Sequence, residues 1–242
     1  MKRLDDVLGY KNMKIYQDSQ FFSFSLDSII LGNYSTVRYR DKMIVDFCTG
    51  NGIIPLILSR RTNKPIIGVE IQSKLCDLAN ETILYNHLEN QITIECKDIK
   101  DYSLHHLDEF DLVLCNPPYF KVEDVNFFHN SYEKRVARHE IYLNLNELCT
   151  CAKKVLKEHG TFCLVHRSDR LIEIIEEFRK ANIEPKRIKF IYENIHTMSN
   201  LVLIEGQKSG NIGLKIDKPL ILYNLDGSIT EEYLKLQEEV IL

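Results

Sequence analysis

The residues best suited to chemistry lie in the run Leu114-Cys115-Asn116-Pro117-Pro118-Tyr119-Phe120, directly after an apolar segment. Proline has no N–H and pushes the residue before it into an extended conformation, so two adjacent prolines make a stiff loop that displays carbonyl acceptors. Asn116 adds a side-chain carbonyl, and the ring of Tyr119 can stack on a flat group. These features predict a catalytic clamp for both protons of a planar amino group, formed by Asn116, Pro117, Pro118 and Tyr119.

The predicted clamp suits the transfer of an activated group to that amine. Acceptors that hold the amine while it loses conjugation favour the transition state over the ground state. With an activated donor, positioning supplies most of the acceleration. No general base is required, because the amine sheds its proton after the transfer. The alternative is a rigid turn that only caps a strand.

A loop with two glycines lies upstream, in Val45-Asp46-Phe47-Cys48-Thr49-Gly50-Asn51-Gly52. Glycines let the backbone turn tightly and let a ligand approach without a Cβ in the way. Pro55 stands where the phosphate-binding pattern G-x-G-x-x-G has its third glycine, which disfavours a phosphate ligand. The acidic loop instead suits a ligand with a cationic amine and no phosphate, such as S-adenosylmethionine. Taken alone, the loop is also compatible with a plain strand-to-helix turn.

Two further acids end the next two predicted strands. Glu70 is placed to accept hydrogen bonds from ribose hydroxyls, with Ile71 beside it. Asp98 can accept from the exocyclic amine of the cofactor's adenine, and Ile99 can pack on the adenine ring. Ligands bind at the carboxyl ends of strands in open α/β sheets, so the three acids together predict a cofactor site there.

The elements that position these residues alternate as short apolar strands and longer amphipathic helices, which indicates a βαβ fold. Parallel strands are expected at 43–47, 65–71, 92–96, 110–115 and 161–166, and helices at 53–61, 73–87, 143–157 and 169–181. Segments 187–192 and 200–205 are too close for a crossover helix and must pair antiparallel. The predicted fold is α/β and Rossmann-like, with a seven-stranded sheet that ends in an antiparallel hairpin, as in class I methyltransferases.

The 242 residues predict one domain with three parts, namely an N-terminal extension (1–40), the Rossmann-like core (41–207) and a C-terminal tail (208–242). In the extension, segments 14–17 and 21–24 are expected to form a hairpin. A helix is expected at 26–37, capped near Ser25 or Asp27, and a short strand at 219–223.

The composition is that of an ordinary globular protein, with 44% hydrophobic and 27% charged residues. No apolar run approaches the ~20 residues of a membrane span, and the N-terminus lacks the apolar core of a signal peptide, so we expect a cytoplasmic protein without membrane association. The seven cysteines lie mostly in apolar segments and are expected to be reduced, with no metal site. The net charge of −4 offers little support for a nucleic-acid partner unless basic residues cluster locally.

Asn116-Pro117-Pro118-Tyr119 matches the (Asn/Asp)-Pro-Pro-(Tyr/Phe) motif of class I amino-methyltransferases, which act on adenine N6, guanine N2 or glutamine amides. The segment from Phe24 to Gly32, the block Ala137-Arg138-His139-Glu140 and the segment from Leu222 to Tyr233 resemble the bacterial tRNA (adenine-N6)-methyltransferases that modify adenine 37 of valine tRNA. The resemblance covers nearly the whole chain.

The resemblance implies an S-adenosylmethionine-dependent enzyme with tRNA as its substrate and no obligate protein partner. The residues that it and the spacing assign to the cofactor are Asp27, Asp46, Cys48, Gly50, Asn51, Gly52, Glu70, Ile71, Asp98, Ile99 and Asn116. Asp27 is expected near the methionine end. Cys48 departs from the first glycine that many relatives have, and we expect it to act as a small buried side chain rather than a reactive thiol.

Basic residues follow the clamp and are candidates for phosphate contacts around a flipped base, namely Lys134, Arg135, Arg138 and Arg167. A solvated surface is the alternative for this group. Three other functions share the clamp or the fold: methylation of rRNA or DNA adenine, methylation of a protein glutamine amide, and a catalytically silent RNA-binding module. The short segment before the first core strand disfavours the glutamine enzymes, which carry a larger N-terminal helical domain, and no inserted target-recognition domain supports a DNA enzyme.

Overall fold

The computed structural model describes residues 1–7, 10, 12–19, 21, 25–117 and 143–237. Five parallel strands form the centre of its main sheet, in the spatial order β7-β6-β3-β4-β5. Their bounds are β3 (Ile44–Phe47), β4 (Ile66–Glu70), β5 (Ile92–Cys96), β6 (Phe110–Cys115) and β7 (Leu156–Arg167). The sequence-based bounds are confirmed within one residue, except that β7 begins at Leu156, five residues before the expected start at 161.

An antiparallel pair completes the sheet next to β7. β9 (Leu201–Lys208) runs antiparallel to both β7 and β8 (Ile183–Tyr192), as the short connection between them predicts. Two short strands, β10 (Lys215–Ile216) and β11 (Leu220–Ile221), pair with β8, so the described part of the sheet has nine strands rather than seven. β11 confirms the short strand expected at 219–223, whereas β10 was not predicted, because a two-residue exposed strand leaves no apolar pattern in the sequence.

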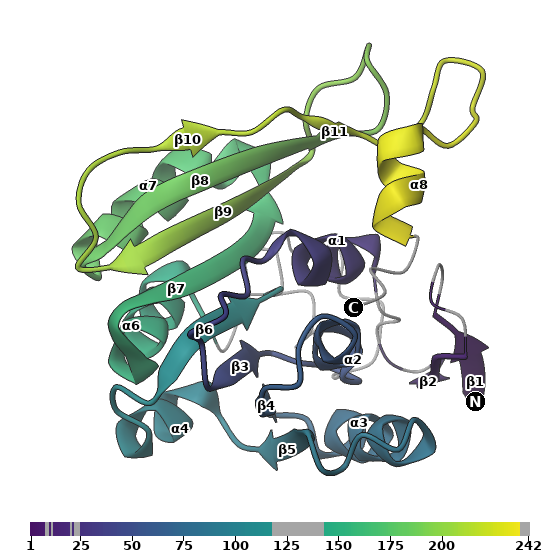
Figure 1. Ribbon diagram of the computed structural model, residues 1–242, viewed down its shortest axis with the longest axis vertical. Coiled ribbons are helices and arrows are strands. Elements are labelled where there is room, and N and C mark those ends of the chain that lie inside the picture. Colours follow the sequence, from purple (N-terminus) through teal and green to yellow (C-terminus); the bar gives the residue numbers. More distant parts are fainter. Residues whose placement is uncertain (8–9, 11, 20, 22–24, 118–142, 238–242) are drawn as a thin grey trace, which may run out of the picture.

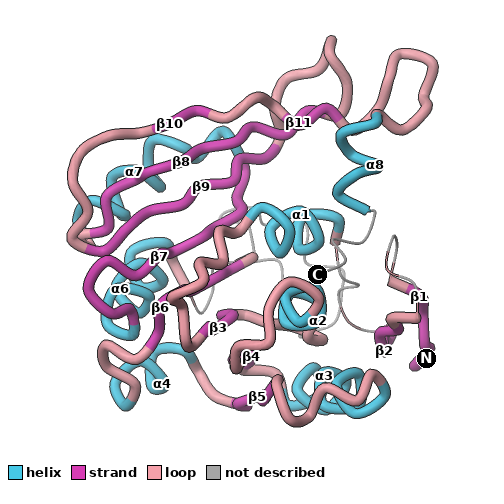
Figure 2. Tube along the Cα trace, in the orientation of Figure 1, coloured by secondary structure: helices cyan, strands magenta, loops and turns pink. Residues whose placement is uncertain are grey.

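Helices cover both faces of the sheet (Figures 1 and 2). One layer contains α1 (Leu26–Tyr34), α2 (Ile53–Ser59) and α3 (Ser73–Tyr85). The other contains α4 (Ile99–His105), α6 (Leu145–Val155) and α7 (Leu171–Lys180), with a 3-10 turn, Ser168–Arg170, before α7. The sequence patterns did not predict α4 or α8 (Glu231–Gln237).

The alternation of side chains along each strand divides the core into two clusters. On β3, Ile44 packs with α1 and α2, whereas Val45 packs with the layer of α6 and α7. On β6, Leu112 and Leu114 face the first cluster and Val113 the second. Strands that are buried on both faces read as continuous apolar runs, which is why their positions were predictable from the sequence.

The N-terminal hairpin differs from the expected one. β2 (Lys14–Asp18) pairs antiparallel with β1 (Lys2–Asp6), so its described partner precedes it in the chain. The expected pairing with 21–24 is therefore wrong for Phe21, which instead packs against Leu75 and Leu78 of α3, and residues 22–24 lie outside the described part. β1 reads Lys-Arg-Leu-Asp-Asp and lacks the apolar alternation that marks a strand in a sequence.

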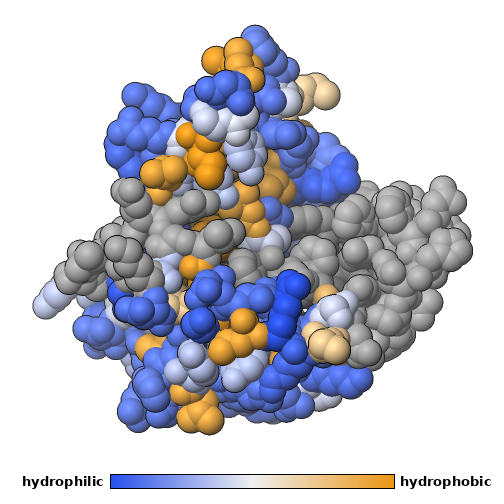
Figure 3. Space-filling model, turned by 90° about the vertical axis from the view of Figure 1, so that its right-hand side faces the viewer, coloured by the Kyte–Doolittle hydropathy of each residue, from blue (hydrophilic) through white to orange (hydrophobic). Residues whose placement is uncertain are grey.

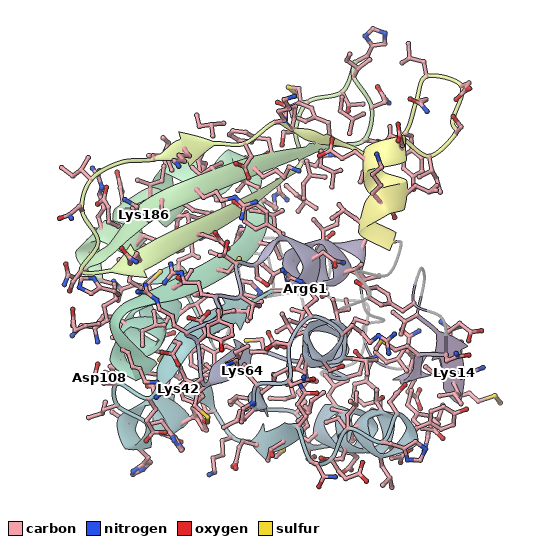
Figure 4. The ribbon with its side chains drawn as sticks, in the orientation of Figure 1. Lys14, Lys42, Arg61, Lys64, Asp108 and Lys186 are labelled. Carbon is pink, nitrogen blue, oxygen red and sulfur yellow. The ribbon has the colours of Figure 1, made fainter. Side chains whose placement is uncertain are left out.

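The hairpin is fixed to α3. The Tyr16 backbone N–H donates to the Thr82 hydroxyl at 3.0 Å, and the Asn86 side chain bonds both backbone groups of Lys14. Lys14 lies at the periphery on the side of the hairpin, and Arg61 lies between α1 and α2 (Figure 4). No helix in the described ranges is long and apolar enough to cross a membrane.

Candidate active site

The carboxyl ends of β3, β4, β5 and β6 bring the predicted site residues to one edge of the sheet. Strand register places Phe47 beside both Val69 and Cys115, so the glycine loop, Glu70 and Asn116 follow neighbouring strand ends. β3 and β6 point toward the side of the molecule that carries the N-terminal hairpin and α8 (Figure 1). Viewed from that side, apolar side chains lie near the middle of the molecule, and smaller apolar groups lie among the polar side chains above and below (Figure 3).

The loop after β3 adopts the backbone conformation that its glycines suggest. Gly50 and Gly52 have φ of 59° and 86°, and Cys48 has a φ of 57°, which is uncommon for a residue with a side chain. This conformation explains why a glycine suits position 48. A Cβ added at Gly50 would meet no atom within 4 Å, so the loop presents an open face there.

Glu70 ties this loop to the end of β4. Its carboxylate accepts the Gly50 N–H at 2.9 Å and the Gln72 N–H at 3.0 Å. The side chain is buried, and burial raises its pKa, while hydrogen bonds from Gln72, Gly50 and Ile71 oppose that rise. A carboxylate has about four lone-pair positions, so Glu70 can accept further hydrogen bonds at the open face of the loop. Ile71, the next residue, is 46% exposed.

Asp46 is fully buried beneath the loop, and neither of its carboxylate oxygens has a hydrogen-bond partner among the described residues. Burial raises its pKa well above the usual value, and the Glu70 carboxylate raises it further. The Thr49 hydroxyl lies close enough to lower that pKa in part, yet it does not reach hydrogen-bonding geometry. Two buried acids beside an open glycine loop fit a ligand that brings positive charge and hydrogen-bond donors.

Four other residues predicted to bind the cofactor lie in the following places. Asp98 is the N-cap of α4 and accepts the Lys100 N–H at 2.8 Å, while Ile99 is buried in the core. The Asn51 side chain donates to the Tyr16 carbonyl at 3.0 Å and so joins the glycine loop to the N-terminal hairpin. Asp27 lies in the first turn of α1 and is partly buried.

Asn116 follows β6 and contacts the start of α1. Its Nδ2 donates to the Ser28 hydroxyl at 2.8 Å and lies 3.4 Å from the Ser25 hydroxyl. Sequence reasoning missed both serines, because 88 residues separate Ser28 from Asn116 and no local pattern links them. Pro117 is buried, and Pro118 and Tyr119 lie outside the described residues.

The family model of the methyltransferase small domain matches residues 27–191, about two thirds of the chain, including the glycine loop and the Asn-Pro-Pro run. The chain belongs to this family. The expectation of an S-adenosylmethionine-dependent methyltransferase is thereby confirmed, together with the α/β fold.

Two curated relatives are tRNA1(Val) (adenine(37)-N6)-methyltransferases. The protein of Parabacteroides distasonis is 24% identical over 94% of this chain and 97% of its own length. That of Actinobacillus pleuropneumoniae is 25% identical over 96% of both chains.

Solved structures share the fold of this methyltransferase. A predicted O-methyltransferase from Agrobacterium tumefaciens superposes with a TM-score of 0.69 at 16% identity, covering 88% of this chain and 95% of its own. Geranyl diphosphate C-methyltransferase from Streptomyces coelicolor, solved with S-adenosyl-L-homocysteine, gives a TM-score of 0.54 at 12% identity and covers 75% of this chain and 76% of its own.

Of the four basic residues expected to bind RNA, the structure of the methyltransferase describes Arg167. Arg167 ends β7, next to the strand that leads to Asn116, and its side chain forms an ion pair with Asp169. Lys134, Arg135 and Arg138 lie outside the described residues.

Asp46 is buried without a hydrogen-bond partner among the described residues, so its charge should affect the stability of the cofactor-free methyltransferase. Folding raises the Asp46 pKa, so the folded state is penalised as pH rises above the usual carboxyl pKa of about 4. Asp46→Asn removes that charge and should stabilise the free protein by about 1–3 kcal/mol at pH 8, which raises the Tm by about 2–4 °C per kcal/mol. Near pH 4 the gain should vanish, because the carboxyl is then protonated in the folded state.

Thermal unfolding at pH 4 and pH 8 measures this effect, and titration with S-adenosylmethionine supplies the second readout. If Asp46 faces the cationic cofactor, Asp46→Asn should weaken binding while it raises the Tm. Equal Tm values for the wild-type protein and Asp46→Asn at pH 8 would show that the buried Asp46 carboxylate does not destabilise the folded state.

Proposed function

We propose that this methyltransferase transfers the methyl group of S-adenosylmethionine to the exocyclic N6 amine of an adenine in tRNA, and specifically of adenine 37 in valine tRNA. The observation that carries the proposal is the position of Asn116, at the end of β6 and beside the cofactor edge, with its amide nitrogen bonded to α1. The names of the relatives, which match over nearly the full length of the chain, support the choice of substrate.

The cofactor binds at the carboxyl-terminal edge of the parallel strands, where the glycine loop and the buried acids lie. Glu70 accepts the ribose hydroxyls, and Asp46 balances the positive charge at the methionine end, near Asp27. Asp98 and Ile99 border the adenine, through the start of α4. When bound, S-adenosylmethionine supplies an activated methyl group, so the protein needs to provide position rather than a strong base.

The target amine is held by acceptors on both sides. Because the Asn116 amide nitrogen donates to Ser28, its oxygen occupies the other branch of the planar amide, where it accepts one N–H of the adenine amine. The backbone carbonyl of Pro117 accepts the second N–H, and Tyr119 stacks on the base. Both acceptors strengthen as the amine nitrogen loses conjugation, which lowers the barrier to transfer.

The rest of the chain serves the same task in this proposal. Residues 1–242 form one methyltransferase domain, in which the extension 1–40 closes the cofactor edge through the Asn51 to Tyr16 hydrogen bond. Lys134, Arg135, Arg138 and Arg167 contact phosphates around the target base. A tRNA substrate implies a cytoplasmic enzyme.

Methyl transfer to purified RNA tests the proposal directly. The protein is incubated with labelled S-adenosylmethionine and unmodified valine tRNA, and the product is digested and identified by nucleoside mass. We expect one N6-methyladenosine per tRNA, and loss of labelling when adenine 37 is replaced by guanine. Labelling of rRNA, DNA or a glutamine peptide instead of tRNA, or a methyl group on a ring nitrogen, would contradict the proposal.

A further inference from the structure

The loop between β8 and β9, residues 193–200, lies at the same edge of the sheet as Asn116. β8 runs parallel to β7 and β6, because β9 is antiparallel to both β7 and β8. The loop therefore follows a carboxyl end, as Asn116 does, and it projects beyond the sheet (Figures 1 and 2). In the strand registers, the start of β9 lies two strands across and three residues along from Cys115, about 10 Å in each direction. An RNA with a base at Asn116 reaches this loop within a few nucleotides, since stacked nucleotides are about 3.4 Å apart.

Hydrogen bonds fix the shape of the loop. The His196 N–H donates to the Asn194 Oδ1 at 2.9 Å and the Thr197 N–H to the Asn194 carbonyl at 3.2 Å, so one asparagine closes the turn with its side chain and its backbone. At the base of the loop, the Ser168 N–H donates to the Asn200 carbonyl at 3.1 Å, which ties the loop to the end of β7. A ligand that binds to a loop held in this way orders few residues and so loses little affinity to entropy.

Apolar and aromatic side chains are exposed on this turn. Ile195 and Met198 are 66% and 86% exposed, and neither belongs to a hydrophobic cluster of the described residues. His196, between them in the chain, is exposed as well. Apolar side chains are visible at the top of the molecule, the part that contains this loop (Figure 3). Residues 193–200 include no lysine or arginine, so the turn is suited to the flat faces of bases rather than to phosphates.

Unpaired RNA bases have the chemistry that such a turn can bind. They expose flat faces that pack on apolar side chains and on imidazole, whereas a duplex presents mainly its phosphates and sugars. The turn also lies on the edge that the RNA must approach if its adenine is to reach Asn116. A protein partner on this turn would compete with the RNA for that approach.

We propose that residues 193–200 are an RNA-binding element, in which Ile195, His196 and Met198 pack on unpaired bases near the target adenine. The inference rests on the proposed function for the identity of the RNA. It assigns to this turn a contact with bases, in addition to any contact that basic residues make with phosphates.

Binding of unmodified valine tRNA tests the inference. The double variant Ile195→Ala/Met198→Ala removes apolar surface from the turn, and we expect the Kd for this RNA, measured by fluorescence anisotropy, to rise about 10-fold. The KM for tRNA should rise by a similar factor. The kcat and the Kd of S-adenosylmethionine should stay within about 2-fold, because the turn touches neither the target amine nor the cofactor. Met198→Phe should bind the RNA at least as tightly as the wild type, since a phenyl ring stacks on a base.

Ile212→Ala is the matched control. Ile212 is 86% exposed, as Met198 is, and it lies in the connection after β9, at the opposite edge of the sheet. Its replacement should leave the Kd for valine tRNA within about 2-fold. A rise equal to that of the double variant would show that exposed apolar side chains bind the RNA without regard to position, and would overturn the inference.

The salt dependence of binding separates base contacts from phosphate contacts. A contact with a phosphate releases counterions, so its loss makes the plot of log Kd against log salt concentration less steep by about one unit. The double variant should bind more weakly with an unchanged slope. It should also bind a blunt RNA duplex as the wild type does, because the duplex offers no unpaired base. A shallower slope, or an equal loss on the duplex, would contradict the assignment to bases.

The same measurements distinguish this inference from the proposed function. An unchanged Kd in the double variant, with normal transfer to adenine 37 by the wild type, would overturn the inference alone. A wild-type protein that binds valine tRNA through the turn but methylates no adenine would refute the proposed function alone. A wild-type dimer in sedimentation that becomes a monomer in the double variant, with the Kd for RNA unchanged, would assign the turn to self-association and overturn the inference.

Discussion

Asn116→Ala is expected to lower kcat by ~10²-fold or more, the usual loss when one preorganised hydrogen-bond acceptor or donor is removed from a transition state. The substitution leaves the Pro117 carbonyl as the remaining acceptor, so the target amine retains its conjugation and sits loosely. It also removes the donor to Ser28, which lies on a different element, α1. Cofactor affinity should change much less than kcat, because Asn116 is only one of the residues assigned to the cofactor and both Asp46 and Glu70 are untouched.

Single-turnover transfer of labelled methyl to unmodified tRNA measures this effect without interference from product release. Asn116→Asp is the matched control, because it retains an oxygen acceptor and should keep more activity than the alanine variant. Transfer at the wild-type rate by Asn116→Ala would remove the basis of the N6-amine mechanism.

Glu70→Ala is expected to weaken S-adenosylmethionine binding by about 1–3 kcal/mol, or roughly 5- to 150-fold in Kd. The substitution removes the proposed ribose acceptor and also leaves the Gly50 and Gln72 N–H groups without their acceptor. The glycine loop should loosen, so the Tm of the free protein should fall as well.

A cofactor analogue that lacks the ribose hydroxyls separates these two effects in calorimetric titration. If Glu70 binds the ribose, Glu70→Ala should weaken the natural cofactor more than the analogue. Equal losses for both ligands would mean that Glu70 acts only through the loop. Unchanged affinity for S-adenosylmethionine would exclude Glu70 from the cofactor site.

The sequence by itself determined the features that depend on local covalent chemistry and on periodicity. Apolar strands, buried on both faces over most of their length, marked β3, β4, β6 and β7. The short connection after 192 required the antiparallel pair β8 and β9. The prolines at 117 and 118 and the glycines at 50 and 52 restrict or free the backbone wherever they occur. Because strand ends meet at one edge in a parallel sheet, the predicted grouping of the glycine loop, Glu70 and Asn116 followed from order alone.

Only the tertiary structure decided which groups face one another across elements. The contact of Ser28 with Asn116 depends on how α1 packs on α2 and β7, and no spacing in the chain encodes it. The lack of a hydrogen-bond partner for Asp46 within the described ranges likewise follows from its burial, since an acid at a strand end is more often solvated. β1, made mostly of charged residues, becomes a strand because β2 offers it a backbone edge. Hydrogen bonds between distant segments form wherever packing brings donor and acceptor together, and that packing is set by the whole fold rather than by the residues that make the bond.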